Sequence, residues 1–197
     1  RYPLVEFITG ILFVLFVNSS PTFQNFNSNL FLQVFFSWLF LSLLICISLI
    51  DISCFWIPQG LINFGFISGL IGLITIEILN DKFIDLFLIT KGLSTPVISF
   101  LIFEFLRHCA RYFFKKDAIG KGDSKLVAML AIWLGPIGTL LAVGLSYIFA
   151  AIYCLVGLST NFLKFRQVIP FAPFISLGGL VIWLFGNEFI ILKILRI

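Results

Sequence analysis

The sequence predicts an all-α membrane protein, a polytopic helix bundle of about six or seven membrane segments in a single membrane-embedded domain over residues 1–197. Composition is the first reason: 60% of the residues are hydrophobic and 11% are charged, whereas soluble domains carry about 25% charged residues. The second reason is the length of the apolar stretches, because a membrane-spanning helix needs about 20 mostly apolar residues. The third is their pattern, which lacks the short alternating segments of a membrane β-barrel.

The apolar stretches that reach or approach this length are 3–17, 29–50, 60–79, 95–114, 124–157 and 172–195. The fifth is too long for one crossing and carries Gly135-Pro136 near its middle. Because the residue before a proline avoids helical geometry, we expect one helix to end near residue 134 and another to begin near 137. The sixth stretch is interrupted by the sequence Gly-Asn-Glu at 186–188.

The charged residues predict how the helices are oriented. Lys and Arg gather in segments 107–125 and 158–170, whereas segment 18–28 has no charge and segment 80–94 is balanced. Since basic residues favour the cytoplasmic side, threading the helices places Asp51 and Asp123 together at the cytoplasmic membrane boundary. The net charge of +4 therefore fits topology, and a longest basic run of two lysines, 115–116, does not favour a nucleic-acid partner.

Asp51 and Asp123 are the candidate catalytic pair. Either one alone could be an ordinary helix-end carboxylate, and Asp123 could be a helix N-cap. Gly120 and Gly122 precede Asp123 and would let the backbone approach its carboxylate closely. Two carboxyl groups at one depth can share a proton, so that one activates water and the other polarises a carbonyl. Such hydrolysis needs no metal or organic cofactor, and none is expected.

Four segments in order resemble the type IV prepilin peptidases. GKGD at 120–123, with the helix SKLVAMLAIWLG after it, is similar to the GxGD signature of that family. The others are RYPLVE at 1–6, Asp51 with Ile57-Pro58 after a short spacer, and IPFAPF at 169–174. The GxGD core by itself is shared with other intramembrane aspartic proteases, including presenilin, so the order of all four segments carries the resemblance.

The resemblance implies an aspartic endopeptidase in the bacterial inner membrane, a multi-pass protein with its active site facing the cytoplasm. It would cleave the basic leader from a prepilin, or from a secretion pseudopilin, at the cytoplasmic boundary. Asp51 and Asp123 would be catalytic, and Pro58, Gly120, Gly122 and Lys125 belong to the matching motifs. The partners implied are that substrate and the lipid bilayer; oligomeric state is not indicated.

The chain also departs from the family pattern. Gln59 stands where many members have a second Asp after the proline, and no CxxC pair of the zinc-binding kind occurs. We therefore expect the peptidase portion without the upstream zinc-binding, methylating region, and no metal site. N-methyltransferase activity does not follow from these residues, although Glu6 lies in a segment that the family associates with it.

Other polar residues have simpler interpretations. Glu104 lies in an apolar stretch and could pair with Arg107 or His108 on the same helix face. Lys125 could act on the Asp123 carboxylate, guide the substrate, or anchor the helix at the lipid headgroups. The alternative to an enzyme is a small proton- or cation-coupled transporter, which would place acids near the bilayer midplane within an inverted repeat; neither feature is found.

Overall fold

The computed structural model describes residues 6–7, 9–14, 29–79, 86–115, 120–164 and 167–186. The main elements are five helices: α2 (Asn29–Cys54), α3 (Gln59–Leu79), α4 (Leu86–Phe114), α5 (Lys121–Ser159) and α6 (Ala172–Phe185). No β-strand occurs in these ranges. The all-α fold class predicted from composition is therefore confirmed.

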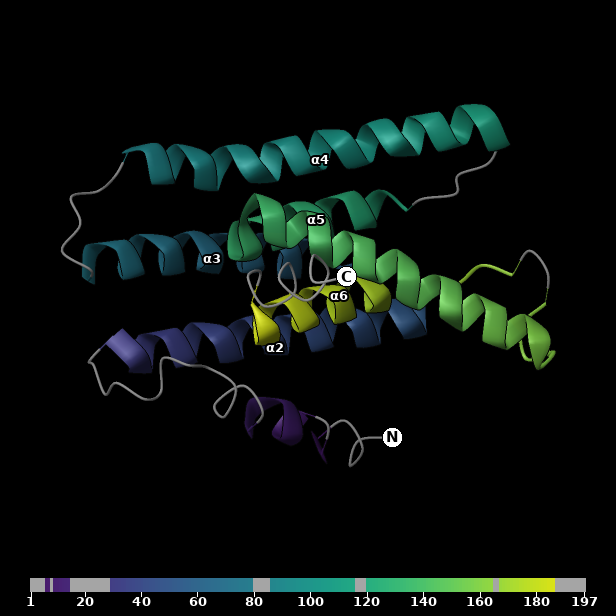
Figure 1. The fold of residues 1–197 in the computed structure, drawn as a ribbon, viewed down its shortest axis with the longest axis horizontal. Helices are drawn as coiled ribbons and strands as arrows, with labels where there is room; N and C mark the ends of the chain where they lie inside the picture. Colours follow the sequence, from purple (N-terminus) through teal and green to yellow (C-terminus); the bar gives the residue numbers. More distant parts are fainter. Residues whose placement is uncertain are drawn as a thin grey trace, which may run out of the picture.

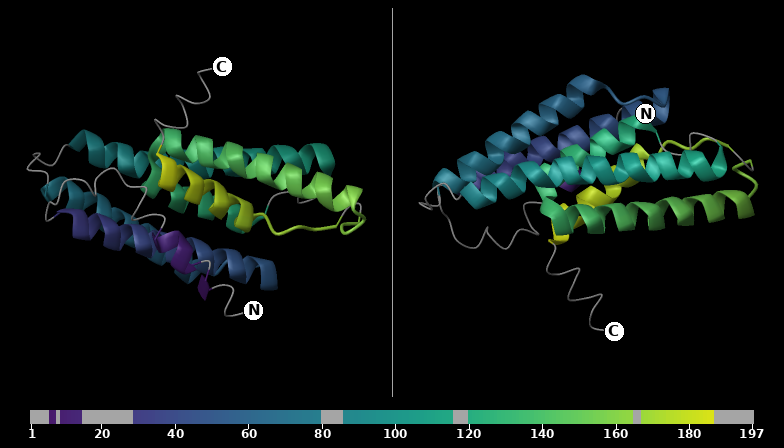
Figure 2. Two further views of the ribbon diagram at one scale, coloured as in Figure 1. Left: turned by 60° about the horizontal axis from the view of Figure 1, so that its bottom comes forward. Right: turned by 90° about the horizontal axis from the view of Figure 1, so that it is seen from above.

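The helices form an elongated bundle around α5. Helix α5 packs against both α4 and α6, and α2 packs against α3 and α6. Figure 1 shows α4 along one side of the bundle and α2 along the other, with α3, α5 and α6 between them. In the left view of Figure 2 the helices run roughly along one direction, and the right view shows that α3 crosses α4 and the second arm of α5 obliquely.

Helix α5 consists of two arms that meet at Gly135. Gly135 has φ 68° and ψ −178°, a conformation that is essentially restricted to glycine, and Pro136 follows it. The Thr139 hydroxyl donates a hydrogen bond to the Gly135 carbonyl at 2.6 Å. In Figure 1 the second arm turns back along the first, so that both ends of α5 lie toward the same end of the bundle. The predicted break at Gly135-Pro136 is thus confirmed.

Within the residues that the structure describes, three helices contain segments long and apolar enough to cross a membrane: Val34–Cys54, Leu93–Tyr112 and Lys121–Ser159. Gln59–Thr75 and Ala172–Phe185 are shorter apolar helices. Helix α6 ends at Phe185 and Gly186 follows with φ 75°, where the sequence predicted an interruption. The expected stretch 3–17 falls only partly within the described residues, and residues 187–195 of the last stretch lie outside them.

Helix α4 begins at Leu86 and continues through Pro96. Its segment of membrane-spanning length, Leu93–Tyr112, agrees within two residues with the predicted apolar stretch 95–114. A proline in a membrane helix is tolerated because neighbouring groups can satisfy the backbone carbonyl that it leaves unpaired. Pro96 itself is fully buried, and packing at this position therefore holds the helix together across the proline.

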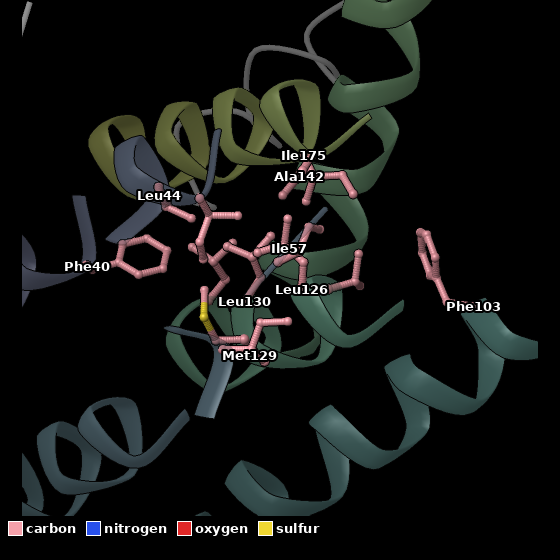
Figure 3. Packing of buried hydrophobic residues seen from close by; sticks show 14 of the residues in the cluster. Phe40, Leu44, Ile57, Phe103, Leu126, Met129, Leu130, Ala142 and Ile175 are labelled. Atoms are coloured by element: carbon pink, nitrogen blue, oxygen red, sulfur yellow. The ribbon is translucent and has the colours of Figure 1, made fainter. Parts of the chain in front are cut away.

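The core joins α2, α5 and α6. Figure 3 shows Phe40 and Leu44 of α2 beside Leu126 and Leu130 of α5, with Ile175 of α6 close to them. The Phe40 ring stacks on Trp133 of α5 with centroids 4.8 Å apart. Tight packing of this kind is what holds helices together in lipid, where the surroundings are as apolar as the core. It fixes the three helices whose ends carry the candidate site.

Candidate active site

Asp51 lies near the C-terminal end of α2 and is buried, with 6% of its surface exposed. Its Oδ2 accepts a hydrogen bond from the backbone N–H of Ala172 at 3.1 Å. Ala172 is the first residue of α6, where backbone N–H groups have no partner within the helix and favour a negative charge. The beginning of α6 therefore holds the Asp51 carboxylate.

Asp123 lies in the first turn of α5 and is also buried, with 7% exposed. Its Oδ2 accepts a hydrogen bond from the backbone N–H of Gly120 at 3.2 Å. Gly120 is the N-cap of α5, and Asp123 occupies the third position of the helix. The alternative in which Asp123 is the N-cap was therefore wrong. The side chain instead reaches back to the cap, as Glu or Gln does in a capping box.

The fold brings these two aspartates together. Helix α2 leads into a turn whose Ile57 packs on Gly122, the residue before Asp123. Both occupy helix ends, Asp51 in the last turn of α2 and Asp123 in the first turn of α5. A transporter with acids at the bilayer midplane would require a different placement.

The turn between α2 and α3 packs directly on the glycine motif. A Cβ atom on Gly122 would lie 3.0 Å from Cδ1 of Ile57, so the absent side chain permits this close approach. The Pro58 carbonyl accepts hydrogen bonds from the N–H groups of Leu61 and Ile62 at 3.1 and 3.4 Å. Pro58 thereby begins α3, and Gly122 lets the α2–α3 turn lie beside Asp123.

Lys125 contacts α3. Its Nζ donates to Oε1 of Gln59 at 2.5 Å, and Nε2 of Gln59 donates to Oδ1 of Asn63 at 2.9 Å. All three side chains are exposed. Gln59, which departs from the family pattern, is therefore the acceptor for the motif lysine. This contact ties the first turn of α5 to the first turn of α3.

Helix α4 approaches the same turn of α5 through Glu104. Glu104 forms an ion pair with Arg107, and its Oε2 lies 3.8 Å from Nδ1 of His108. The pairing with Arg107 was predicted from helix spacing and is confirmed. His108, the predicted alternative, lies closer to the backbone of Glu104, with its Nδ1 2.8 Å from the carbonyl oxygen. Ser124 Oγ also donates to Oε1 of Glu104 at 3.0 Å.

Residues 38–155 match the sequence model of the Type IV leader peptidase family. The chain belongs to the type IV leader peptidase family. It is 27% identical over 91% of its length to the "Type 4 prepilin-like proteins leader peptide-processing enzyme" of Escherichia coli O78:H11, covering 60% of that protein. It is 26% identical over 96% of its length to the "Prepilin leader peptidase/N-methyltransferase" of Bacillus subtilis, covering 68%. It is 27% identical over 96% to the Legionella pneumophila protein of the same name, covering 61%.

This chain thus spans about three fifths of the length of the E. coli and Legionella relatives. No solved structure matches it. The resemblance inferred from the four motifs is confirmed at the level of the type IV leader peptidase family. The matched residues 38–155 include Asp51 and Asp123, whereas Ala172, which holds Asp51, lies beyond them.

The sequence did not single out several residues at this candidate site. Tyr147 lies on the second arm of α5, near enough for the charge of Asp123 to act on it. Its ring packs on Phe171, with centroids 5.2 Å apart. Gly135 lies midway in sequence between Asp123 and Tyr147. Because a chain that folds back at Gly135 brings these two residues near each other, the predicted break could have indicated that they are neighbours. Ser124 and Ala172 lie in two of the matching segments, but nothing in the sequence predicted their contacts with Glu104 and Asp51.

Proposed function

We propose that this chain is the peptidase portion of a prepilin leader peptidase, an aspartic endopeptidase with Asp51 and Asp123 as its catalytic pair. The substrate would be the basic leader of a type IV prepilin-like protein, cut where its hydrophobic helix enters the bilayer. The observation that supports the proposal is the position of two buried carboxyl groups at helix ends that pack together, Asp51 at the end of α2 and Asp123 at the start of α5. The names of the E. coli and Bacillus subtilis relatives support the substrate class.

The chemistry follows from two carboxyl groups that share one proton. The ionised carboxylate takes a proton from water as the water oxygen bonds to the scissile carbonyl carbon. The protonated carboxyl group gives its proton to the carbonyl oxygen. In the second step the carbon–nitrogen bond breaks as the carboxyl group that accepted the proton from water gives it to the nitrogen. The other carboxylate takes a hydroxyl proton from the intermediate, so the pair again holds one proton. The products are a new carboxyl terminus and a new amine, and no covalent enzyme intermediate forms.

Proteolysis at the membrane boundary fits the helix ends that carry the pair. The basic segments 107–125 and 158–170 favour the cytoplasmic side for this end of the bundle, and Asp123 lies in the first of them. A leader that is basic and cytoplasmic would reach the pair from that side. The bacterial inner membrane and a cytoplasm-facing site therefore form part of the proposal.

The test is cleavage of a prepilin by the full-length protein reconstituted in lipid. Asp51→Asn and Asp123→Asn keep the shape of each side chain and remove its acid–base capacity, which contributes about 100-fold to 10,000-fold in enzymes. We expect each variant to lose at least about 100-fold of the cleavage rate. Asp117→Asn, at an aspartate outside the motifs, is the matched control and should cleave normally. Full cleavage by either catalytic variant would refute the proposed pair.

A further inference from the structure

Glu104 and Arg107 form an ion pair inside a segment that is apolar enough to cross a membrane, Leu93–Tyr112. Their side chains are 21% and 12% exposed. Ionisable groups at such positions are costly in lipid, which makes them candidates for a function. The proposed hydrolysis at Asp51 and Asp123 does not use either of them.

The ion pair connects to the site through Ser124. Ser124 is fully buried, follows Asp123 directly, and donates its hydroxyl hydrogen bond to Oε1 of Glu104 at 3.0 Å. Arg107 donates from its Nε to the other oxygen, Oε2, at 3.0 Å. One oxygen of the Glu104 carboxylate is therefore bound by Arg107 on the same helix, and the other is bound by Ser124 in the first turn of α5.

Apolar packing supports the same contact. Phe103 precedes Glu104 and is buried in the core cluster that also contains Leu126 and Val127 of α5. Figure 3 shows Phe103 projecting from α4 toward the helices that carry the rest of this cluster. The approach of α4 to the first arm of α5 is thus fixed by packing, and the Glu104–Ser124 hydrogen bond lies within that contact.

We propose that Glu104 is a positioning residue for the peptidase reaction, acting through Ser124 on the placement of Asp123. The inference rests on the proposed function, since it assigns Glu104 a part in aligning the two aspartates. The first turn of α5 is held from three sides: Gln59 of α3 binds Lys125, Ile57 packs on Gly122, and Glu104 of α4 binds Ser124. The Glu104 contact reaches the fully buried Ser124, which follows Asp123 directly, so it holds the backbone next to the carboxyl group that Gly120 binds.

The experiment measures kcat and KM for prepilin cleavage by the reconstituted full-length protein, together with its thermal unfolding. Ser124→Ala and Glu104→Ala each remove the hydrogen bond. We expect kcat to fall about 10-fold in each, with KM within about twofold, since misplacement by about 1 Å can cost up to about 100-fold in rate. The double variant should lose no more than either single variant. Glu104→Gln keeps an oxygen that can accept from Ser124 and should recover most of the rate.

Ser68→Ala is the matched control, because Ser68 is also buried and its hydroxyl bonds within its own helix to Gly65. Unchanged kcat in Ser124→Ala, or losses that multiply in the double variant, would overturn the inference. If the contact is purely structural, its loss will lower the unfolding temperature but leave the kcat of the folded enzyme unchanged. That result would also overturn the inference. Asp123→Asn is assayed alongside: if it cleaves normally the proposed function fails, and if it is inactive while Ser124→Ala cleaves normally only the role of Glu104 fails.

Discussion

Gly178 is where α6 comes closest to α5, and a methyl group there should disturb the site from a distance. A Cβ atom on Gly178 would lie 2.2 Å from the Ala142 carbonyl oxygen, which is backbone, and 2.6 Å from Oγ of Ser146. Ordinary contact begins at 3.4 Å, so the helices must separate by about 1.2 Å, the difference between 3.4 and 2.2 Å. Overpacking of this kind costs about 1–3 kcal/mol.

The same displacement should reach Asp51. Ala172 lies at the start of α6 and donates to Asp51 at 3.1 Å, a distance already near the upper end for a hydrogen bond between N–H and oxygen. A shift of about 1 Å would lengthen or break it, and misplacement on that scale can cost about 100-fold in rate. We therefore expect Gly178→Ala to lower both the unfolding temperature and the rate of prepilin cleavage.

Gly144→Ala provides the matched control for this prediction. Gly144 also lies within a helical arm, the second arm of α5, but a Cβ atom there would meet nothing within 4 Å. Thermal unfolding in detergent and cleavage in lipid are measured for both variants. The reasoning is refuted if Gly178→Ala unfolds and cleaves like Gly144→Ala.

Two further predictions concern α5. Gly135→Ala should destabilise the protein by about 1–3 kcal/mol, because alanine would be strained in the glycine-only conformation at the junction of the two arms. Thermal unfolding measures this loss, and a stability equal to wild type would contradict the requirement for glycine. Tyr147→Leu should lose about 0.5–1.5 kcal/mol through the ring contact with Phe171, whereas Tyr147→Phe keeps that ring. Equal unfolding temperatures for the two Tyr147 variants would show that the ring contact adds no stability.

Features set by neighbouring residues in the chain were predictable from the sequence. The break in α5 followed from Gly135-Pro136, the end of α6 from Gly186, and the Glu104–Arg107 pair from its spacing on a helix. Each of these inferences uses backbone geometry or side chains one helical turn apart, which local sequence determines. The prediction that Asp51 and Asp123 share one depth rested instead on the distribution of charge along the whole chain.

Contacts between helices were not predictable in the same way. The hydrogen bond between Ala172 and Asp51 joins residues 121 positions apart, and that between Ser124 and Glu104 joins residues 20 apart on different helices. Both depend on how helices rotate about their axes and how closely they approach, which small residues such as Gly178 permit. The continuation of α4 through Pro96 had a similar origin, because the burial of Pro96 offset a proline that locally favours a helix end.

The two aspartates share a feature that bears on how they could work as a pair. In each, Oδ2 accepts a hydrogen bond from a backbone N–H at the start of a helix. The donor is Ala172 at the start of α6 for Asp51, and Gly120 at the cap of α5 for Asp123. The N-termini of two helices thus face a pair of acids, and their partial positive charges lessen the mutual repulsion of the carboxyl groups. Across the ranges that the structure describes, no hydrogen bond engages the remaining oxygen, Oδ1, of either side chain. If the pair is catalytic, those two oxygens are the ones that would hold the attacking water and the substrate carbonyl, and α5 and α6 would set their directions.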